Sequence, residues 1–313
     1  MKTPVFPGRN RGNHRGFTLF VFGAFFSPRR AVASALSYCF YGMLMAVVLA
    51  LAGIPAAAQG TAYKAPRGPD GKPNLNGIWQ VLNTANWDIQ THAARPALMT
   101  VAGPAAPIPA PSVLAFGAVG SVPGGLGVVE GDEIPYQPWA AAKKKENAEQ
   151  WLTSDPEIKC YLPGVPRVTY MPFPFQIVQT AKVILISYEF AGATRTIDMG
   201  KPTEAQTESW MGWSNGRWEG DTLVVDVTGQ NDKTWFDRAG NFHSDALHVV
   251  ERYTPRSADT MMYEVTIEDS KVFTRPWKMS MPLYRRAEKN AQIVEFNCVE
   301  FVEELLYGQF RKK

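Results

Sequence analysis

The sequence predicts an all-β protein: an antiparallel up-and-down barrel of eight or more strands, with one short helix and a long irregular excursion. Three observations favour this fold class. The chain after residue 170 consists of β-branched and aromatic runs of strand length, separated by short turns. Only one segment of the chain after residue 58 has helical character. Finally, a row of antiparallel strands leaves two open edges, and closure into a barrel removes both.

Length and composition fit a globular chain. The 313 residues suffice for two average domains or for one large β-barrel. With 45% hydrophobic and 19% charged residues, a disordered chain, a collagen and a disulfide miniprotein are excluded. Residues 1–58 contain six basic and no acidic residues, whereas acidic residues outnumber basic ones in the remainder. This distribution removes the electrostatic support for nucleic-acid binding, and we expect no nucleic-acid partner.

Residues 1–58 are predicted to be a signal peptide. The uncharged apolar run 40–54 is shorter than the about 20 residues that a membrane span needs. Three alanines at 56–58 follow it and form an A-x-A-like cleavage site, which places cleavage between Ala58 and Gln59. We therefore expect a periplasmic or secreted protein without a stable membrane span after processing. An uncleaved anchor is the alternative, because a second apolar run precedes the first, and the export route stays open.

Export changes the interpretation of Cys160 and Cys298. In an oxidising compartment, two thiols in one domain most often pair. Their bridge would close a loop of more than about 100 residues and contribute about 4–5 kcal/mol in the chain-entropy model. A cysteine-based metal site is the alternative, but it lacks a C-x-x-C motif or a nearby histidine. The sequence therefore predicts a disulfide.

The chain after the leader begins with irregular structure. Residues 59–75 are rich in Pro and Gly and predict an extended N-terminal arm, followed by a single domain over 76–313. The first strand is expected at Gly77–Leu82. Residues 96–136 predict an irregular insertion, because proline recurs too often there for a helix or a strand. A helix is expected at 138–152, since it starts with proline and stops before a Ser-Asp-Pro sequence.

The β region follows Cys160. Asn215-Gly216 lies between strand-like flanks and is a strong hairpin signal. Glu219-Gly220-Asp221 predicts a second turn. The remaining strands are expected at Pro172–Thr180, Lys182–Phe190, Thr194–Met199, Thr222–Val227, Leu247–Thr254, Met261–Glu268, Trp277–Arg285 and Gln292–Val299.

Two sets of motifs resemble known proteins. Gly77-Ile78-Trp79 on the first strand is similar to the G-x-W motif with which lipocalins and other calycins begin. Longer phrases between Pro66 and Gly308, such as RWEGDTLVVDV and WFDRAGNFHSDALHVVERY, resemble a family of secreted bacterial proteins that is mostly uncharacterised. The resemblance implies export and a shared fold, and it assigns no reaction.

The polar segment 231–245 is a candidate for chemistry. Loops of this length are usually functional or disordered, and three aromatic residues, Trp235 among them, argue against disorder. The segment offers the carboxylate of Asp237 and the imidazole of His243. An Asp–His pair at a barrel mouth can transfer a proton. The alternative is a polar loop whose side chains cap its turns.

Glu251 is the second candidate. Strand alternation places it on one face with Tyr253 and two aliphatic residues. If this face is the lumen, the carboxyl group must be paired or protonated, and a protonated acid with a raised pKa is a good general acid or base. The alternative is a structural partner for a lumen arginine such as Arg195 or Arg275.

The aromatic residues of the β region favour a pocket for a small hydrophobic or aromatic ligand. The candidates for contact with this ligand are Tyr188, Trp213, Trp235 and Tyr253, with Arg252 as the partner of an anionic group. The histidine spacing around His243 matches no common metal site, so we expect neither a metal nor a cofactor.

These candidates lead to three hypotheses. The first is a cofactor-free enzyme, a lyase, isomerase or hydrolase, in which Asp237, His243 and Glu251 transfer protons. The second is a lipocalin-like carrier without catalysis. The third is a structural protein that docks through the 96–136 insertion. The sequence does not indicate the substrate or the oligomeric state.

Overall fold

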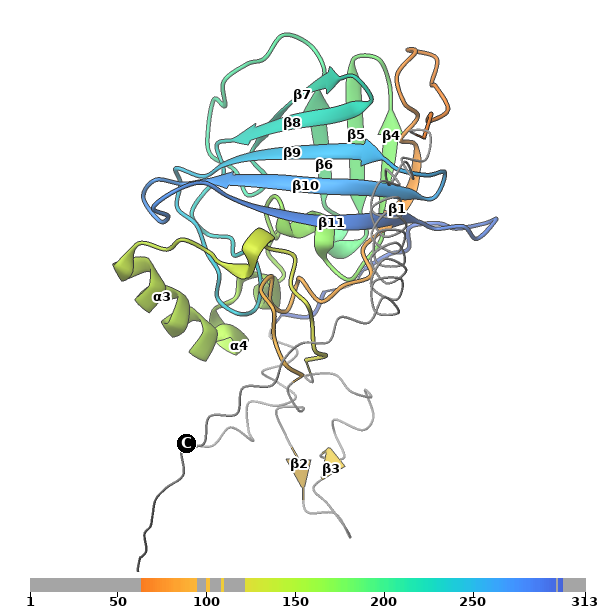
Figure 1. Cartoon of the computed structure of the whole chain (residues 1–313). Helices are drawn as coiled ribbons and strands as arrows, with labels where there is room; N and C mark the ends of the chain where they lie inside the picture. The colour runs from red at the N-terminus through yellow and green to blue at the C-terminus, as the bar shows by residue number, and fades with distance from the viewer. Residues whose placement is uncertain (1–62, 95–99, 102–107, 110–121, 297, 301–313) are drawn as a thin grey trace, which may run out of the picture. The chain divides into compact units, whose positions relative to one another are not determined.

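The computed structural model describes residues 63–94, 100–101, 108–109, 122–296 and 298–300. Within them, nine strands form a closed barrel in the order β1-β11-β10-β9-β8-β7-β6-β5-β4 (Figure 1). The predicted leader with its cleavage site lies outside the described residues, as does most of the 96–136 insertion. The described residues belong to one compact unit, Ala62–Lys313.

The predicted all-β barrel is confirmed, with β1 pairing with both β4 and β11 to close it. All neighbouring barrel strands are antiparallel except β6 and β7, which are parallel. The strands are β1 Gly77–Gln80, β4 Phe175–Gln179, β5 Val183–Tyr188, β6 Thr194–Asp198, β7 Trp213–Glu219, β8 Thr222–Thr228, β9 His248–Pro255, β10 Thr260–Glu268 and β11 Trp277–Arg285. Two further short strands, β2 (Thr100–Val101) and β3 (Ile108–Pro109), pair with each other.

The hairpin predicted at Asn215-Gly216 is wrong, because both residues lie inside β7. A Cβ atom on Gly216 would come within 2.7 Å of Ile197 on β6 and within 2.4 Å of Met199, so this glycine permits a close approach rather than a turn. The second predicted turn is confirmed: Gly220, with a φ of 59°, joins β7 to β8.

The other elements agree with the sequence in part. The predicted helix appears as α3 (Pro138–Glu149) followed by α4 (Trp151–Ser154). No strand occurs at 292–296, where the last strand was expected, because β11 already closes the barrel against β1. Four short 3₁₀ helices lie in the connections: η1 Glu130–Asp132, η2 Pro156–Lys159, η3 Arg167–Tyr170 and η4 Phe190–Gly192. No helix among the described residues has the length and apolar character that a membrane crossing needs.

The two ends of the barrel differ in their connections. At one end, which we call the turn end, residues 180–182, 220–221 and 256–259 form short hairpin turns. At the other, the loop end, 229–247 and the long connection 81–174 join the strands, and the latter carries α3 and α4 (Figure 1).

The N-terminal arm crosses the turn end. Arg67 forms an ion pair of 2.8 Å with Asp221 in the β7–β8 turn. Gln179, the last residue of β4, donates to Asp70 and accepts a hydrogen bond from the backbone N–H of Leu75. The arm is therefore held to two strand ends before β1 begins.

The predicted disulfide is confirmed: Cys160 and Cys298 are bonded, with a Cα–Cα distance of 5.8 Å. It ties the segment after β11 to the end of η2. Phe296 in this segment packs against Phe173 and Phe190, with ring centroids 4.7 and 5.0 Å apart.

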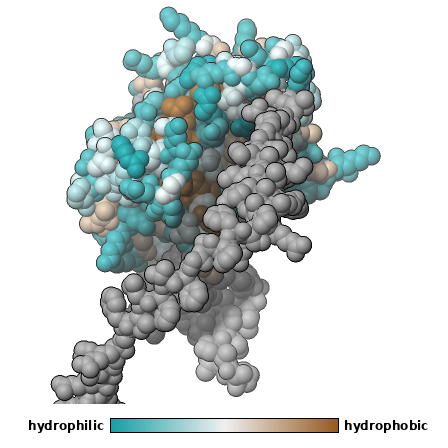
Figure 2. Space-filling model, viewed as in Figure 1, coloured by the Kyte–Doolittle hydropathy of each residue, from teal (hydrophilic) through white to brown (hydrophobic). Residues whose placement is uncertain are grey.

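Side chains of the barrel strands alternate between a buried and a more exposed face, as the period of two requires. The buried side chains of the barrel form one continuous hydrophobic core. The side of the molecule drawn in Figure 2 has a mostly hydrophilic described surface, with a few hydrophobic residues grouped near its centre.

Candidate functional site

A charged pair lies inside the barrel. Glu251 on β9 is fully buried, and it faces inward with Tyr253, as strand parity predicts. Arg195 on β6 meets it with two guanidinium nitrogens: Nη1 donates to Oε1 over 3.1 Å, and Nη2 donates to Oε2. Burial alone lowers the pKa of Arg195, but the charge and hydrogen bonds of Glu251, together with the nearby Tyr188 and Tyr253, outweigh this effect, so the pKa is raised well above its ordinary value.

Three hydroxyl groups complete the pair. The phenols of Tyr253 and Tyr263 donate to Glu251 Oε1 over 3.0 and 2.7 Å. Ser214 Oγ accepts from Arg195 Nε over 2.9 Å. Glu251 therefore accepts four hydrogen bonds, two of them from a cation, and acts as the acceptor of an ion pair rather than as a free acid.

Two further hydroxyls in this region have no hydrogen-bond partner in the part of the chain that the structure describes. They are Tyr188 OH, at the end of β5, and Thr169 Oγ1, on η3; both are buried. Burial raises the pKa of Tyr188 and of Tyr253, and the charge of Arg195 opposes this rise. We call the following seven residues the interior cluster: Thr169, Tyr188, Arg195, Ser214, Glu251, Tyr253 and Tyr263. Among the described residues, Trp277 Nε1 is the one other buried side-chain polar atom without a partner.

Asp237 shapes the loop between β8 and β9. Its carboxylate accepts from the backbone N–H of Ile89 (2.9 Å) and from the N–H and side-chain amide of Asn241 (3.1 and 2.6 Å). Burial raises the pKa of Asp237 to about 7, with a further contribution from the charge of Asp88. Two of the three donors belong to Asn241, and the third is the backbone of Ile89 in the long connection 81–174. The carboxyl group therefore joins these two segments at the loop end.

His243 lies in the same loop but does not contact Asp237. Its Nδ1 is 2.8 Å from the carbonyl of Ser244, which can only accept, so Nδ1 carries the proton. Nε2 then accepts from the Thr234 hydroxyl over 2.6 Å. Burial lowers the pKa of His243. The expected Asp–His hydrogen bond is therefore not formed.

Other candidates lie away from the interior cluster. Arg252 faces outward and pairs with Glu219 over 2.8 Å. Trp213 is exposed and donates to Thr203 Oγ1. Trp235 is half-buried within the 229–247 loop. Thus, of the five residues proposed for ligand contact, the structure brings Tyr188 and Tyr253 to Glu251 and leaves the other three outside.

A second buried ion network, which the sequence did not reveal, holds η3 in place. Arg167 on η3 forms a two-pronged pair with Asp155 over 2.7 and 2.8 Å, and it also donates to Glu157 (3.1 Å) and to Asn86 (2.9 Å). Arg238 donates to Glu157 over 2.7 Å. We call these five residues the cap network. It fixes the position of Thr169, two residues after Arg167.

Aromatic rings complete the cap network. The guanidinium of Arg238 lies 4.2 Å from the ring centre of Trp87 and 5.2 Å from that of Trp151. The members come from distant parts of the sequence, and its only local signal is the Ser-Asp-Pro sequence that ends the predicted helix.

No group of three or more His, Cys, Asp or Glu side chains in the described part of the chain is placed to hold a metal ion. Compared with known proteins, the chain matches no family model, no curated protein and no solved structure.

Proposed function

We propose that the chain is an exported, lipocalin-like binding protein that takes a small apolar or aromatic molecule with one hydrogen-bonding group into its barrel. The observation that carries this proposal is the pair of unpartnered hydroxyls, Thr169 and Tyr188, beside the Arg195–Glu251 pair. A buried hydroxyl without a partner costs about 1–3 kcal/mol. A ligand that bonds to both hydroxyls would recover this free energy.

The surroundings match such a ligand. Apolar and aromatic side chains from every barrel strand surround the polar interior cluster, so the interior combines a large apolar surface with a few polar groups. Binding sites for small molecules have this composition. Thr169 lies on η3, in the long connection at the loop end.

Binding accounts for the geometry better than catalysis does. Proton transfer needs an acid or base that is not already saturated and that reaches the substrate. Glu251 is paired with Arg195 and two phenols. Asp237 is buried and bonds to Asn241 and Ile89, and His243 is buried and bonds to Thr234 and Ser244. The hydroxyls of Thr169 and Tyr188 are neutral groups that suit recognition.

The test compares two probes of similar shape, phenol and toluene, by isothermal titration of the full chain. We expect phenol to bind, and we expect Tyr188→Phe and Thr169→Val to weaken phenol at least about tenfold while leaving toluene unchanged, because a lost hydrogen bond of about 1.4 kcal/mol is tenfold. Tyr161→Phe, at an exposed tyrosine, is the matched control.

Two results would overturn the proposal. The first is that neither probe binds and that the protein purified from its exporting cells yields no small molecule on denaturation. The second is turnover of an extracted compound that Glu251→Gln and His243→Ala reduce about 100-fold, the scale of general acid–base catalysis, since this would establish the enzyme instead.

A further inference from the structure

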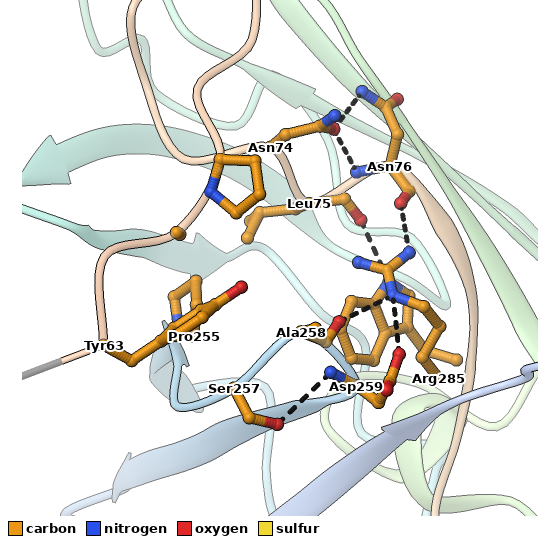
Figure 3. A pocket seen from close by; sticks show the side chains of 12 residues that line it. Tyr63, Asn74, Leu75, Asn76, Pro255, Ser257, Ala258, Asp259 and Arg285 are labelled. Atoms are coloured by element: carbon orange, nitrogen blue, oxygen red, sulfur yellow. Dashed lines mark hydrogen bonds and ion pairs between the residues drawn. The ribbon is translucent and has the colours of Figure 1, made fainter.

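A separate pocket opens at the turn end of the barrel. It has a volume of about 340 Å³ and lies between the N-terminal arm, the β9–β10 turn and the end of β11 (Figure 3). This volume is within the range of small-molecule sites. Ala65, Leu75 and Trp79 are its buried apolar residues, and the ring of Tyr63 and Pro255 lie on the side opposite Arg285 (Figure 3).

Arg285 is the fixed cation of this pocket. Its guanidinium lies 4.3 Å from the ring centre of Trp79, and it donates to the carbonyls of Asn76 (2.6 Å) and Ala258 (3.0 Å). A Cβ atom on Gly77 would lie 2.1 Å from Nη1, so only glycine lets the arginine pass over β1. The guanidinium is thus held in one orientation before any ligand binds.

One nitrogen of this guanidinium remains available. Nη2 of Arg285 donates to no residue in the described part of the chain, and it points into the pocket (Figure 3). The Tyr63 hydroxyl also points toward this space and donates to no described residue. Two unused donors therefore face the pocket.

The one opposing charge is Asp259. The Asp259 carboxylate lies 4.0 Å from Nε of Arg285, the nitrogen that also donates to Ala258. The Asp259 side chain is 68% exposed. Solvent screens such an exposed pair strongly. The pocket therefore presents a guanidinium and a phenol as donors, and it selects a ligand that accepts hydrogen bonds.

We infer that this pocket binds a small aromatic carboxylate. The carboxylate accepts from Arg285 Nη2 and the Tyr63 hydroxyl, and the ring packs against the Tyr63 side chain. A charge-assisted hydrogen bond to a preoriented guanidinium favours a carboxylate over an uncharged acceptor. The site lies at the opposite end of the barrel from η3 and does not depend on the interior cluster.

The test is titration of the full chain with 2-naphthoate and with 2-naphthamide, which has the same shape without the charge. We expect 2-naphthoate to bind at least about tenfold more tightly than the amide, equivalent to about 1.4 kcal/mol. Tyr63→Phe should weaken 2-naphthoate several-fold. Ala258→Trp places an indole over the opening and should abolish binding, whereas Ala141→Trp, on the exposed face of α3, should not.

Arg285→Gln removes two hydrogen bonds that join β11 to the arm and the β9–β10 turn, so its effect on binding is interpreted only if its circular dichroism matches that of the wild type. Tyr63→Phe and Ala258→Trp keep these bonds and decide the question. Equal binding of the amide and the carboxylate, or binding that survives Ala258→Trp, would overturn the inference. Loss of 2-naphthoate binding in Tyr188→Phe would also overturn it, because the ligand would then occupy the barrel interior.

Discussion

Arg167 and Arg195 are both buried, and each forms a two-pronged ion pair with a buried carboxylate, but their surroundings differ. In the cap network every nitrogen of Arg167 has an acceptor, and the acceptors come from two chain segments that are distant in the sequence. In the interior cluster the ion pair is equally complete, yet two hydroxyls beside it have no partner. A saturated network holds chain segments together, whereas an unsaturated one marks a place for a ligand.

The largest expected effect comes from removing one side of either ion pair. Arg195→Met leaves Glu251 buried without its cation and should lower the free energy of unfolding by about 3–5 kcal/mol, as measured by urea denaturation. Arg167→Met should cost a similar amount. Adding Glu251→Gln to Arg195→Met should restore more than half of the loss, because no buried charge remains. A single-variant loss below about 1 kcal/mol would contradict the burial of the pair.

Two tyrosines of the interior cluster differ in their hydrogen bonds, and their phenylalanine variants should differ in stability. Tyr263→Phe removes a hydrogen bond to Glu251 and should cost about 1.5–3 kcal/mol. Tyr188→Phe removes no hydrogen bond, so the free energy of unfolding without ligand should stay the same or rise. Urea denaturation of both variants tests this, and equal losses would mean that Tyr188 is as well bonded as Tyr263.

The loop end should show a pH dependence from Asp237. Its pKa is raised to about 7, so its contribution to stability is complete below pH 4 and is lost as the pH rises through 7. Between pH 5 and 7 this amounts to about 2 kcal/mol. The lowered pKa of His243 acts in the opposite sense, because its contribution is complete above pH 6.5 and is lost as the pH falls.

Asp237→Asn separates these two contributions. With His243 alone remaining, the free energy of unfolding should rise from pH 5 to 7, whereas in the wild type the two trends oppose each other. Denaturation curves at pH 5, 6, 7 and 8 provide the measurement. If the variant has the same pH profile as the wild type, Asp237 does not contribute to the pH dependence of the free energy of unfolding.

The smallest effect is expected on the outer face. Arg252→Ala breaks a surface ion pair with Glu219 and should change the free energy of unfolding by less than about 1 kcal/mol. Because Arg252 points away from the interior, phenol binding should not change. A tenfold loss of phenol affinity in Arg252→Ala would contradict this prediction and show that Arg252 takes part in ligand binding.

The sequence predicted what depends on local pattern. Period-two alternation placed Glu251 and Tyr253 on one face, and the structural alternative for Glu251 named Arg195 or Arg275 as its partner. The compartment argument paired Cys160 with Cys298. These predictions needed only strand parity and cysteine chemistry. Asn215-Gly216 misled because its close contact is with β6, a strand that pairs in parallel and that no local pattern identifies.

What the sequence missed depends on contacts between distant segments. Thr169 reaches the interior cluster because Arg167 is held by Asp155 and Asn86, and nothing near Thr169 in the sequence indicates this. Asp237 and His243 are close in the chain, yet Asn241 and Thr234 satisfy them separately. The local pattern offered the right residue types and could not assign their partners.

The pairing of β1 with β11 has a consequence for the order of assembly. The first barrel strand to be synthesised, β1, can pair with β11 only after the last strand has been made, and Cys160 can form its disulfide only after Cys298 has been made. The barrel therefore cannot close before β11 has been synthesised, and the bridge cannot form before Cys298 has been synthesised. Long-range pairing of this kind folds slowly, so a chain truncated before β11 should remain open, with the edge of β10 unpaired and prone to aggregation.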